Sequence, residues 1–276
     1  MPSKTAIITG AGGTLCSVMT LDLARKGYAV ALLGRTLSKL ETVAERICQD
    51  GGSARCIAVD VTDIAAVRAA GEQVLAELGP CRVLINGAGG KLPGGIMSQT
   101  TFSPDELKPD TDTLGFFNSD LDVFRAELDL NICGTAIPSQ VFGKQMTGAG
   151  GGSIVNFASM TSYRPLSKVP GYAAAKSAIV NYTQWLSAYL APANIRVNAI
   201  APGFIVNERS RKLLYNEDGT PSPRGAQVLG HTPMNRFGEA NELLGALNYF
   251  IDDTASGFVT GVTLPVDGGF LACPGV

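Results

Sequence analysis

The stretch KTAIITGAGGTLC, residues 4–16, decides the fold of this chain. Its β-branched beginning, residues 5–9, predicts a short strand, and the residues after the glycines predict a helix that reaches Lys26. A strand, a glycine-rich turn and a helix in this order are typical of a dinucleotide-binding loop. The glycines let the backbone approach a pyrophosphate, whose charge is met by free N–H groups at the helix start. A plain strand-to-helix turn is the alternative.

The rest of the chain continues the alternation of strands and helices. A chain of 276 residues that is 45% hydrophobic and 17% charged can bury one large core. The strands are continuous apolar runs, as expected when helices cover both faces of a parallel sheet. We therefore predict a single α/β domain, 1–276, with a doubly wound parallel sheet of about seven strands. The predicted strands are Thr5–Thr9, Ala29–Leu33, Arg55–Ala58, Val83–Ile85, Ile154–Phe157, Arg196–Ala201 and Val262–Pro265.

A second informative stretch is PGYAAAKSAIVNYTQWL, in which Tyr172 and Lys176 stand four residues apart. This spacing places both side chains on one face of a helix. A phenol transfers protons at neutral pH only if a fixed cation favours the phenolate, and Lys176 is positioned to be that cation. Ser159, at the end of the run SIVNFAS, offers a hydroxyl that could hold a substrate oxygen beside the phenol. Each of the three also fits an ordinary structural role.

Together with Asp60, NGAGG at 86–90, Asn131 and APG at 201–203, these features resemble the classical short-chain dehydrogenase/reductase family. The resemblance covers nearly the whole chain and implies a Rossmann-type fold and an NAD(P)-dependent oxidoreductase that acts on a secondary alcohol or ketone. The wording GG-x-LC and the stretches LINGAGG and HTPMNRFG resemble bacterial D-mannonate oxidoreductases, also called fructuronate reductases. One departure is that Thr14 and Cys16 replace two glycines of the family's loop.

The resemblance implies four catalytic residues. Tyr172 would give its proton to the developing alkoxide, while Ser159 holds that oxygen. Lys176 would lower the proton affinity of the phenol and bind the nicotinamide ribose, and Asn131 would hold a water that links the lysine to solvent. Capping of a helix is the alternative role for Asn131.

The cofactor site is implied by residues at the ends of several strands. Arg35 follows the second strand where NAD-preferring relatives carry an acidic residue, so we expect NADP, with NAD as the alternative. Asp60 would bind the adenine amine, with a helix cap as its competing role. The cofactor-binding set comprises Gly10, Gly12, Gly13, Thr14, Leu15, Arg35, Asp60, Val61, Asn86, Gly87, Ala88, Tyr172, Lys176, Pro202, Gly203 and Ile205.

The resemblance implies an enzyme with a sugar-acid substrate, which interconverts D-mannonate and D-fructuronate. A related sugar-acid or polyol dehydrogenase such as a gluconate 5-dehydrogenase-like enzyme is the alternative, and a 3-oxoacyl reductase or a non-catalytic nucleotide sensor is less favoured. A carboxylate requires a cation in the pocket, and no spacing selects among several. The candidates are Lys91, Arg164, Lys168 and Arg209. We interpret the segment at about 91–120 as an insertion near the mouth of the active site. The alternative is a disordered loop on the surface.

Composition excludes several other classes. A net charge of −2 without a basic cluster gives no support for nucleic-acid binding. No apolar run is long enough to span a membrane and no signal peptide is evident, so we expect a cytoplasmic protein. The six cysteines form no CxxC pair, and we expect neither disulfides nor a metal. The aromatic helix after Tyr172 favours a homotetramer or homodimer, although a monomer core gives the same pattern.

Overall fold

The computed structural model describes residues 4–272, except the side chains of residues 208 and 209. Seven parallel strands form one sheet in the order β3-β2-β1-β4-β5-β6-β7. Each predicted strand is confirmed, with ends that differ by no more than two residues. The strands are β1 (Lys4–Thr9), β2 (Tyr28–Gly34), β3 (Ala54–Ala58), β4 (Cys81–Asn86), β5 (Gly152–Phe157), β6 (Ile195–Pro202) and β7 (Thr263–Val266).

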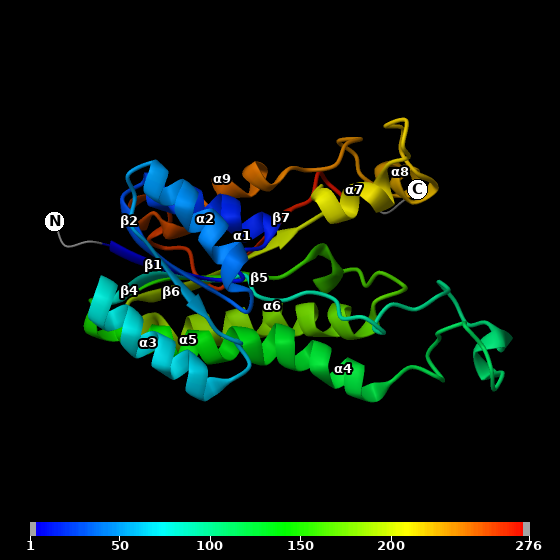
Figure 1. The fold of residues 1–276 in the computed structure, drawn as a ribbon, viewed down its shortest axis with the longest axis horizontal. Helices are drawn as coiled ribbons and strands as arrows, with labels where there is room; N and C mark the ends of the chain where they lie inside the picture. Colours follow the sequence, from blue (N-terminus) through cyan, green and yellow to red (C-terminus); the bar gives the residue numbers. More distant parts are fainter. Residues whose placement is uncertain (1–3, 273–276) are drawn as a thin grey trace.

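Helices cover both faces of the sheet, which gives the predicted doubly wound α/β fold (Figure 1). One layer contains α1 (Thr14–Arg25), α2 (Leu37–Gln49) and α9 (Leu244–Ile251), and the other contains α3 (Ile64–Leu78), α5 (Gly134–Gly148) and α6 (Pro170–Leu190). The shorter helices are η1 (Pro104–Leu107), α4 (Leu121–Leu128), η2 (Asp129–Cys133), η3 (Met160–Ser162), η4 (Ala191–Ala193), α7 (Glu208–Leu214), α8 (Pro223–Gly230), η5 (Ala240–Leu243) and α10 (Asp253–Ser256).

The strands are apolar at consecutive positions because the sheet has a core on each side. Ile8 belongs to the core under α1 and α9, which includes Phe250. Its neighbour Ile7 points to the opposite face and belongs to the core under α3 and α5, which includes Phe142. Two buried layers explain why the strand sequences lack the polar alternation of a half-exposed sheet.

The strand order places a ligand-binding edge at the carboxyl ends of the strands. After β1 the chain moves outward through β2 and β3, and it then returns to β4 on the other side of β1. Open parallel sheets bind ligands at such a switch point. The loops that follow β1, β2, β4 and β5 therefore meet at one edge, where the sequence predicted the functional residues.

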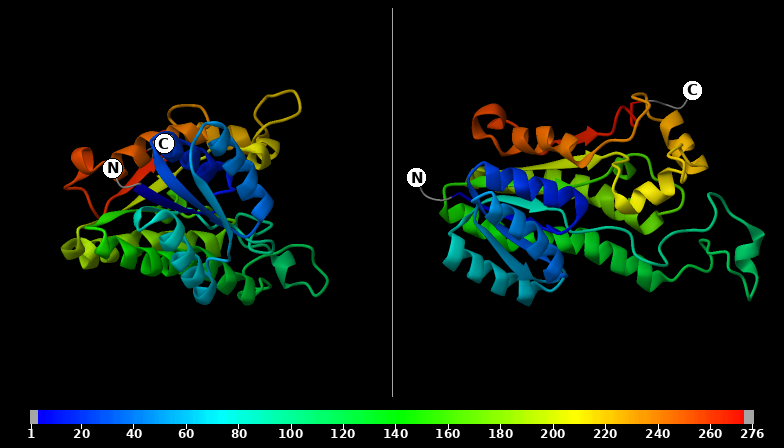
Figure 2. Two further views of the ribbon diagram at one scale, coloured as in Figure 1. Left: turned by 60° about the vertical axis from the view of Figure 1, so that its left-hand side comes forward. Right: turned by 45° about the horizontal axis from the view of Figure 1, so that its top comes forward.

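Residues 91–120 form a long connection between β4 and α4. Figures 1 and 2 show that most of it projects beyond the sheet and its helical layers. The segment has its own hydrogen bonds, because Ser98 N–H donates to Leu114 O at 2.8 Å and Leu114 N–H donates to Ser98 Oγ at 3.0 Å. Within residues 4–272, no helix has the length and apolar character needed to cross a membrane.

Candidate active site

Ser159, Tyr172 and Lys176 come together at the carboxyl end of β5. Ser159 lies just beyond this strand, where its hydroxyl accepts a hydrogen bond from Thr161 N–H at 3.2 Å as the N-cap of η3. Tyr172 and Lys176 occupy the first two turns of α6, which begins with Pro170 at its first position. The Ser159 hydroxyl also forms a hydrogen bond with the phenol of Tyr172. The structure therefore joins the three residues that the sequence predicted to act together.

Lys176 is a buried ammonium with one close partner. Its Nζ donates to the carbonyl oxygen of Phe157 at 2.7 Å and lies 5.7 Å from the centre of the Tyr172 ring. Burial lowers the pKa of Lys176 from 10.5 to about 8, and the nearby thiol of Cys16 opposes this shift. The amine is therefore poised to exchange a proton not far above neutral pH.

The phenol of Tyr172 behaves differently from the sequence-based expectation. Its burial raises the pKa, the hydrogen bond with Ser159 lowers it, and the charge of Glu127 raises it. Burial is the largest of these effects. The pKa of Tyr172 therefore lies above its ordinary value.

Asn131 is buried in η2, a π-helical turn between α4 and α5. Its Nδ2 donates to Gly90 O at 3.0 Å and to Glu127 O at 2.8 Å, and its Oδ1 accepts from Gly90 N–H at 3.0 Å. Both amide hydrogens are thus used by the backbone, and the predicted hold on a water stays a prediction. The alternative of a helix cap is wrong, because Leu128 is the N-cap of η2 and Cys133 is the N-cap of α5. Asn131 instead fixes the backbone at Gly90, and π-helical turns of this kind are frequent at functional sites.

The glycine loop after β1 forms a cradle. Gly10 has a φ of +67°, and a Cβ there would lie 2.9 Å from backbone atoms of Ala88. A Cβ on Gly12 would lie 2.8 Å from Cβ of Lys39. Gly13 is the N-cap of α1 and has no side chain with which to cap the first N–H groups of the helix. These groups are thus oriented to receive an anion such as a pyrophosphate.

The cradle opens into a crevice of about 420 Å³. Its walls include Arg35 after β2, Asp60 and Val61 after β3, and Gly87 and Ala88 after β4. Asp60 accepts hydrogen bonds from Thr62 N–H at 2.9 Å and Thr62 Oγ1 at 2.7 Å, which lower its pKa. The competing cap role of Asp60 is wrong, because Asp63 is the N-cap of α3.

Several predicted cofactor residues do not line this crevice. Asn86 is buried beneath it, where Nδ2 donates to Ser139 Oγ at 2.9 Å and to Asn156 Oδ1 at 2.8 Å. Leu15 packs partly buried against the core under α1, and Thr14 is the exposed first residue of that helix. Pro202 is the last residue of β6, one residue beyond the predicted end of that strand, and Gly203 N–H donates to Val266 O at 3.0 Å.

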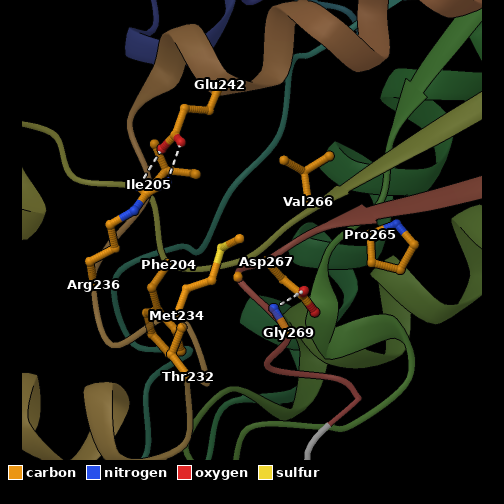
Figure 3. A pocket seen from close by; sticks show the side chains of 12 residues that line it. Phe204, Ile205, Thr232, Met234, Arg236, Glu242, Pro265, Val266, Asp267 and Gly269 are labelled. Atoms are coloured by element: carbon orange, nitrogen blue, oxygen red, sulfur yellow. Dashed lines mark hydrogen bonds and ion pairs between the residues drawn. The ribbon is translucent and has the colours of Figure 1, made fainter.

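Ile205 contributes to a different cavity, of about 350 Å³ (Figure 3). Figure 3 shows the ion pair of Arg236 with Glu242 on one side and the Asp267 carboxylate bound to Gly269 N–H on another. The charged groups that line this cavity already have partners, and the lining contains neither Ser159 nor Tyr172. We therefore do not place the reaction in this cavity.

The four predicted substrate cations come from three segments of the chain. Lys91 is exposed, and its Nζ lies 5.5 Å from the centre of the Tyr172 ring. The Lys168 ammonium donates to the carbonyl of Ser98 and thereby ties the 91–120 segment to the loop before α6. Arg164 is exposed in that same loop. Arg209 lies in α7, but its side chain is outside the described part of the structure.

Two residues near the site escaped the sequence analysis. Lys39 lines the crevice together with Arg35. It is the third residue of α2, just after the turn that follows β2, and this position could have indicated a cofactor contact in the sequence. Glu127 on α4 is only 1% exposed and its charge acts on Tyr172. Nothing in the sequence around Glu127 distinguishes it from a surface carboxylate.

Five cysteines are free thiols in the described part of the chain, and Cys273 lies outside the described range. Burial raises the pKa of the Cys16 thiol to about 12, which makes it an inert core side chain. The described residues contain no group of His, Cys, Asp or Glu side chains able to hold a metal ion.

Comparison with known proteins identifies the class to which this fold and site belong. The family model for short chain dehydrogenases matches residues 4–218, so the chain belongs to the short-chain dehydrogenase family of oxidoreductases. It is 43% identical to the uncharacterized oxidoreductase UxuB of Bacillus subtilis (strain 168) over 276 residues, which are 100% of this chain and 98% of that protein.

Two further relatives bear on substrate and cofactor. A crystal structure of a candidate D-mannonate oxidoreductase from Haemophilus influenzae with bound NAD is 42% identical, with a TM-score of 0.94 and coverage of 99% of this chain and 96% of that one. The 2-dehydro-3-deoxy-D-gluconate 5-dehydrogenase of Escherichia coli (strain K12) is 30% identical over 99% of this chain and 97% of that protein.

Proposed function

We propose that this oxidoreductase interconverts a sugar acid and its keto form, D-mannonate and D-fructuronate, with NAD(P) as the hydride carrier. The observation that carries the proposal is the position of Lys91, a cation beside the Ser159–Tyr172 pair and two residues after Gly89, which lines the crevice. The names of the Haemophilus and Escherichia relatives support a sugar-acid substrate.

The residues have distinct roles in the proposed reduction. The bound cofactor supplies hydride to the carbonyl carbon. Tyr172 donates its proton to the carbonyl oxygen, which the Ser159 hydroxyl holds in place. Lys176 stabilises the phenolate that remains, and its pKa of about 8 allows it to pass a proton onward near neutral pH. Asn131 fixes Gly90 and thereby the chain between the crevice and Lys91.

The cradle and crevice fit a dinucleotide. The space left by Gly10 and Gly12 brings backbone close to the site of a pyrophosphate, and uncapped N–H groups at the start of α1 face it. Arg35 and Lys39 put two cations where a ribose 2′-phosphate would lie, so we propose NADP as the preferred cofactor. The NAD bound to the Haemophilus relative keeps NAD as the alternative.

Lys91 is the best-placed cation for the substrate carboxylate. It is exposed and adjacent to the phenol, so a short acid bound through Lys91 would present its carbonyl to Tyr172. Lys168 is occupied by the Ser98 carbonyl and serves to hold the segment. The insertion-like segment 91–120 would thus contribute to the substrate site through its first residue, Lys91.

A spectrophotometric screen tests the proposal. D-fructuronate, 5-ketogluconate and matched neutral ketoses are each offered with NADPH and with NADH. We expect turnover of D-fructuronate, and we expect Lys91→Met to raise its KM about ten- to a hundredfold through loss of a charge-assisted hydrogen bond. Equal or better turnover of the neutral ketoses, with no effect of Lys91→Met, would rule out a sugar-acid substrate.

The alternatives give different outcomes in the same screen. Preference for 5-ketogluconate would identify a gluconate 5-dehydrogenase-like enzyme, as the resemblance to the Escherichia relative would allow. Tight binding of nucleotide without turnover of any ketone would instead favour a nucleotide sensor. A 3-oxoacyl substrate is added to the screen, and its turnover would place the enzyme with the acyl reductases.

We also propose that the protein acts as a homotetramer or homodimer in the cytoplasm. Tyr182, Trp185 and Tyr189 stack along α6, with ring centres 6.1 Å and 5.2 Å apart. Trp185 is 57% exposed and Tyr189 is 69% exposed, and aromatic surface of this kind is typical of interfaces. Sedimentation of the protein and of Trp185→Glu tests this assembly, which the charge should weaken.

A further inference from the structure

Glu127 is a buried carboxylate beside the candidate active site. It lies on α4 with 1% of its surface exposed, and its Oε1 accepts a hydrogen bond from Leu92 N–H at 2.9 Å. Its Oε2 is buried without a hydrogen-bond partner among the described residues. A buried charge with an unpaired oxygen destabilises a protein, so its presence calls for a physical reason.

The surroundings of Glu127 are shaped to receive the carboxylate. A Cβ on Gly95 would lie 2.5 Å from Oε1, and a Cβ on Gly171 would lie 2.4 Å from Oε2. Gly171 is the residue before Tyr172 and belongs to the first turn of the 21-residue helix α6. The positive end of this helix compensates part of the charge of the carboxylate. Glu127 thus joins the turn at 92–95 to the start of the helix that carries the phenol.

Lys91 lies between Gly90 and Leu92, and both of these neighbours are hydrogen-bonded by side chains from the α4–η2 segment. Asn131 holds Gly90 through both its N–H and its carbonyl, and Glu127 holds Leu92. Asn131 and Glu127 stand one helical turn apart, and Asn131 Nδ2 also donates to Glu127 O at 2.8 Å. The ammonium of Lys91, which stands between these two neighbours, lies over the Tyr172 ring.

We propose that Glu127 is a positioning residue, whose carboxylate holds the 91–95 turn so that Lys91 stays over Tyr172 and meets the anionic end of the substrate. The role of Lys91 rests on the proposed function, whereas the hold on the turn does not. Glu127 acts through Lys91 and through its charge on the phenol, and it is not assigned a contact with substrate.

The charge of Glu127 gives a readout that a purely structural side chain would not have. The polar and charged groups around the phenol of Tyr172 are Ser159 after β5, Lys176 on α6, Lys91 on the 91–95 turn and Glu127 on α4. The negative charge raises the pKa of Tyr172, so its removal lowers that pKa. The acid limb of the oxidation profile, where phenolate is the base, should therefore move to lower pH.

The test uses Glu127→Gln, which keeps an oxygen for Leu92 N–H and removes the charge, and Glu127→Ala, which removes both. Glu106→Gln is the matched control, because Glu106 is 4% exposed with a buried unpartnered Oε1 but does not act on Tyr172. We expect Glu127→Gln to shift the pH profile of kcat/KM downward. Glu106→Gln should leave it in place.

A double-mutant cycle tests whether Glu127 works through Lys91. We expect Glu127→Ala to raise KM for the acid about fivefold or more, with a smaller change in kcat, and to add nothing in the Lys91→Met background. Additive effects on KM together with an unshifted pH profile for Glu127→Gln would overturn the proposal. If Glu127→Ala does not fold, the Glu127→Gln profile alone decides.

Hydrogen–deuterium exchange separates this inference from the substrate proposal, because it requires no turnover. Peptides that cover 90–98 should exchange at least several-fold faster in Glu127→Ala and close to the wild-type rate in Glu127→Gln. Unchanged exchange in Glu127→Ala would show that Glu127 does not hold the turn. If exchange is faster but no sugar acid is turned over, the inference that Glu127 holds the turn stands, and only the proposed substrate is rejected.

Discussion

The thiol of Cys16 fills the space that a side chain on Gly87 would need. A Cβ on Gly87 would lie 2.1 Å from Cys16 Sγ and 3.0 Å from Thr9 O. Cys16 replaces a glycine of the family's phosphate loop, and its side chain is 4% exposed and belongs to the core under α1. The departure from the family pattern therefore packs α1 against the turn after β4, and Cys16 does not line the crevice.

Gly87→Ala is expected to destabilise the protein by about 1–3 kcal/mol through overpacking. Chemical denaturation measures the free energy of unfolding. The control variant is Gly245→Ala, because no atom lies within 4 Å of a Cβ at this position. Gly219→Ala is unsuitable as a control because Gly219 has a positive φ.

Cys16→Ala should suppress part of this effect, since it removes the sulfur that clashes. The combined variant should lose less stability than the sum of the single variants. Strict additivity would show that the contact with Thr9 O, and not Cys16, excludes the side chain at Gly87.

The fold was predictable because each strand of a parallel sheet is an apolar run bounded by loops. The run AIA in β6 and the run SIVNF in β5 need no tertiary information to be recognised as buried. The pairing of Tyr172 with Lys176 was equally accessible, since helical spacing alone places them on one face. These predictions depend only on local periodicity.

The site details that the sequence did not show depend on contacts between distant segments. Asn86 carries a polar side chain at a strand end, but the sheet turns it toward Ser139 and Asn156. The sequence FRAEL around Glu127 is that of an exposed helix, and the 91–95 turn and the start of α6 cover it. Burial created by another part of the chain leaves no mark on the local sequence.

Arg35→Ala is expected to weaken NADPH binding about ten- to a hundredfold and to change NADH binding little, because a charge-assisted hydrogen bond to the 2′-phosphate is lost. Fluorescence titration of each reduced cofactor gives the two Kd values. Arg46→Ala, an exposed position on α2, is the control. Equal weakening of both cofactors by Arg35→Ala would argue for NAD as the natural cofactor.

Tyr172→Phe is expected to lower kcat about a thousandfold, since it removes the proton donor and keeps the ring. Binding of the reduced cofactor should stay within about threefold, which separates the chemical role from the binding role. Tyr189→Phe, on the exposed part of α6, should retain the wild-type rate. A residual rate above about a tenth of wild type would assign the proton transfer to another group.

Lys176→Met is expected to abolish activity and to stabilise the protein at pH 7. The pKa of Lys176 is about 8 in the folded protein and 10.5 as its ordinary value. Below pH 8 both states carry the proton, and the buried ammonium destabilises the fold by up to about 3 kcal/mol. Loss of the hydrogen bond to Phe157 O offsets about 1 kcal/mol of the gain, which leaves about 1–2 kcal/mol.

The advantage of Lys176→Met should shrink as pH rises from 8 to 10.5. Over this range the folded wild type has released the proton while the unfolded chain still binds it, so wild-type stability rises relative to the variant. Denaturant titrations at pH 7 and pH 10 measure the change, with exposed Lys144→Met as the control. A variant less stable than wild type by the same amount at both pH values would mean that Lys176 is not held in the folded protein at a lowered pKa.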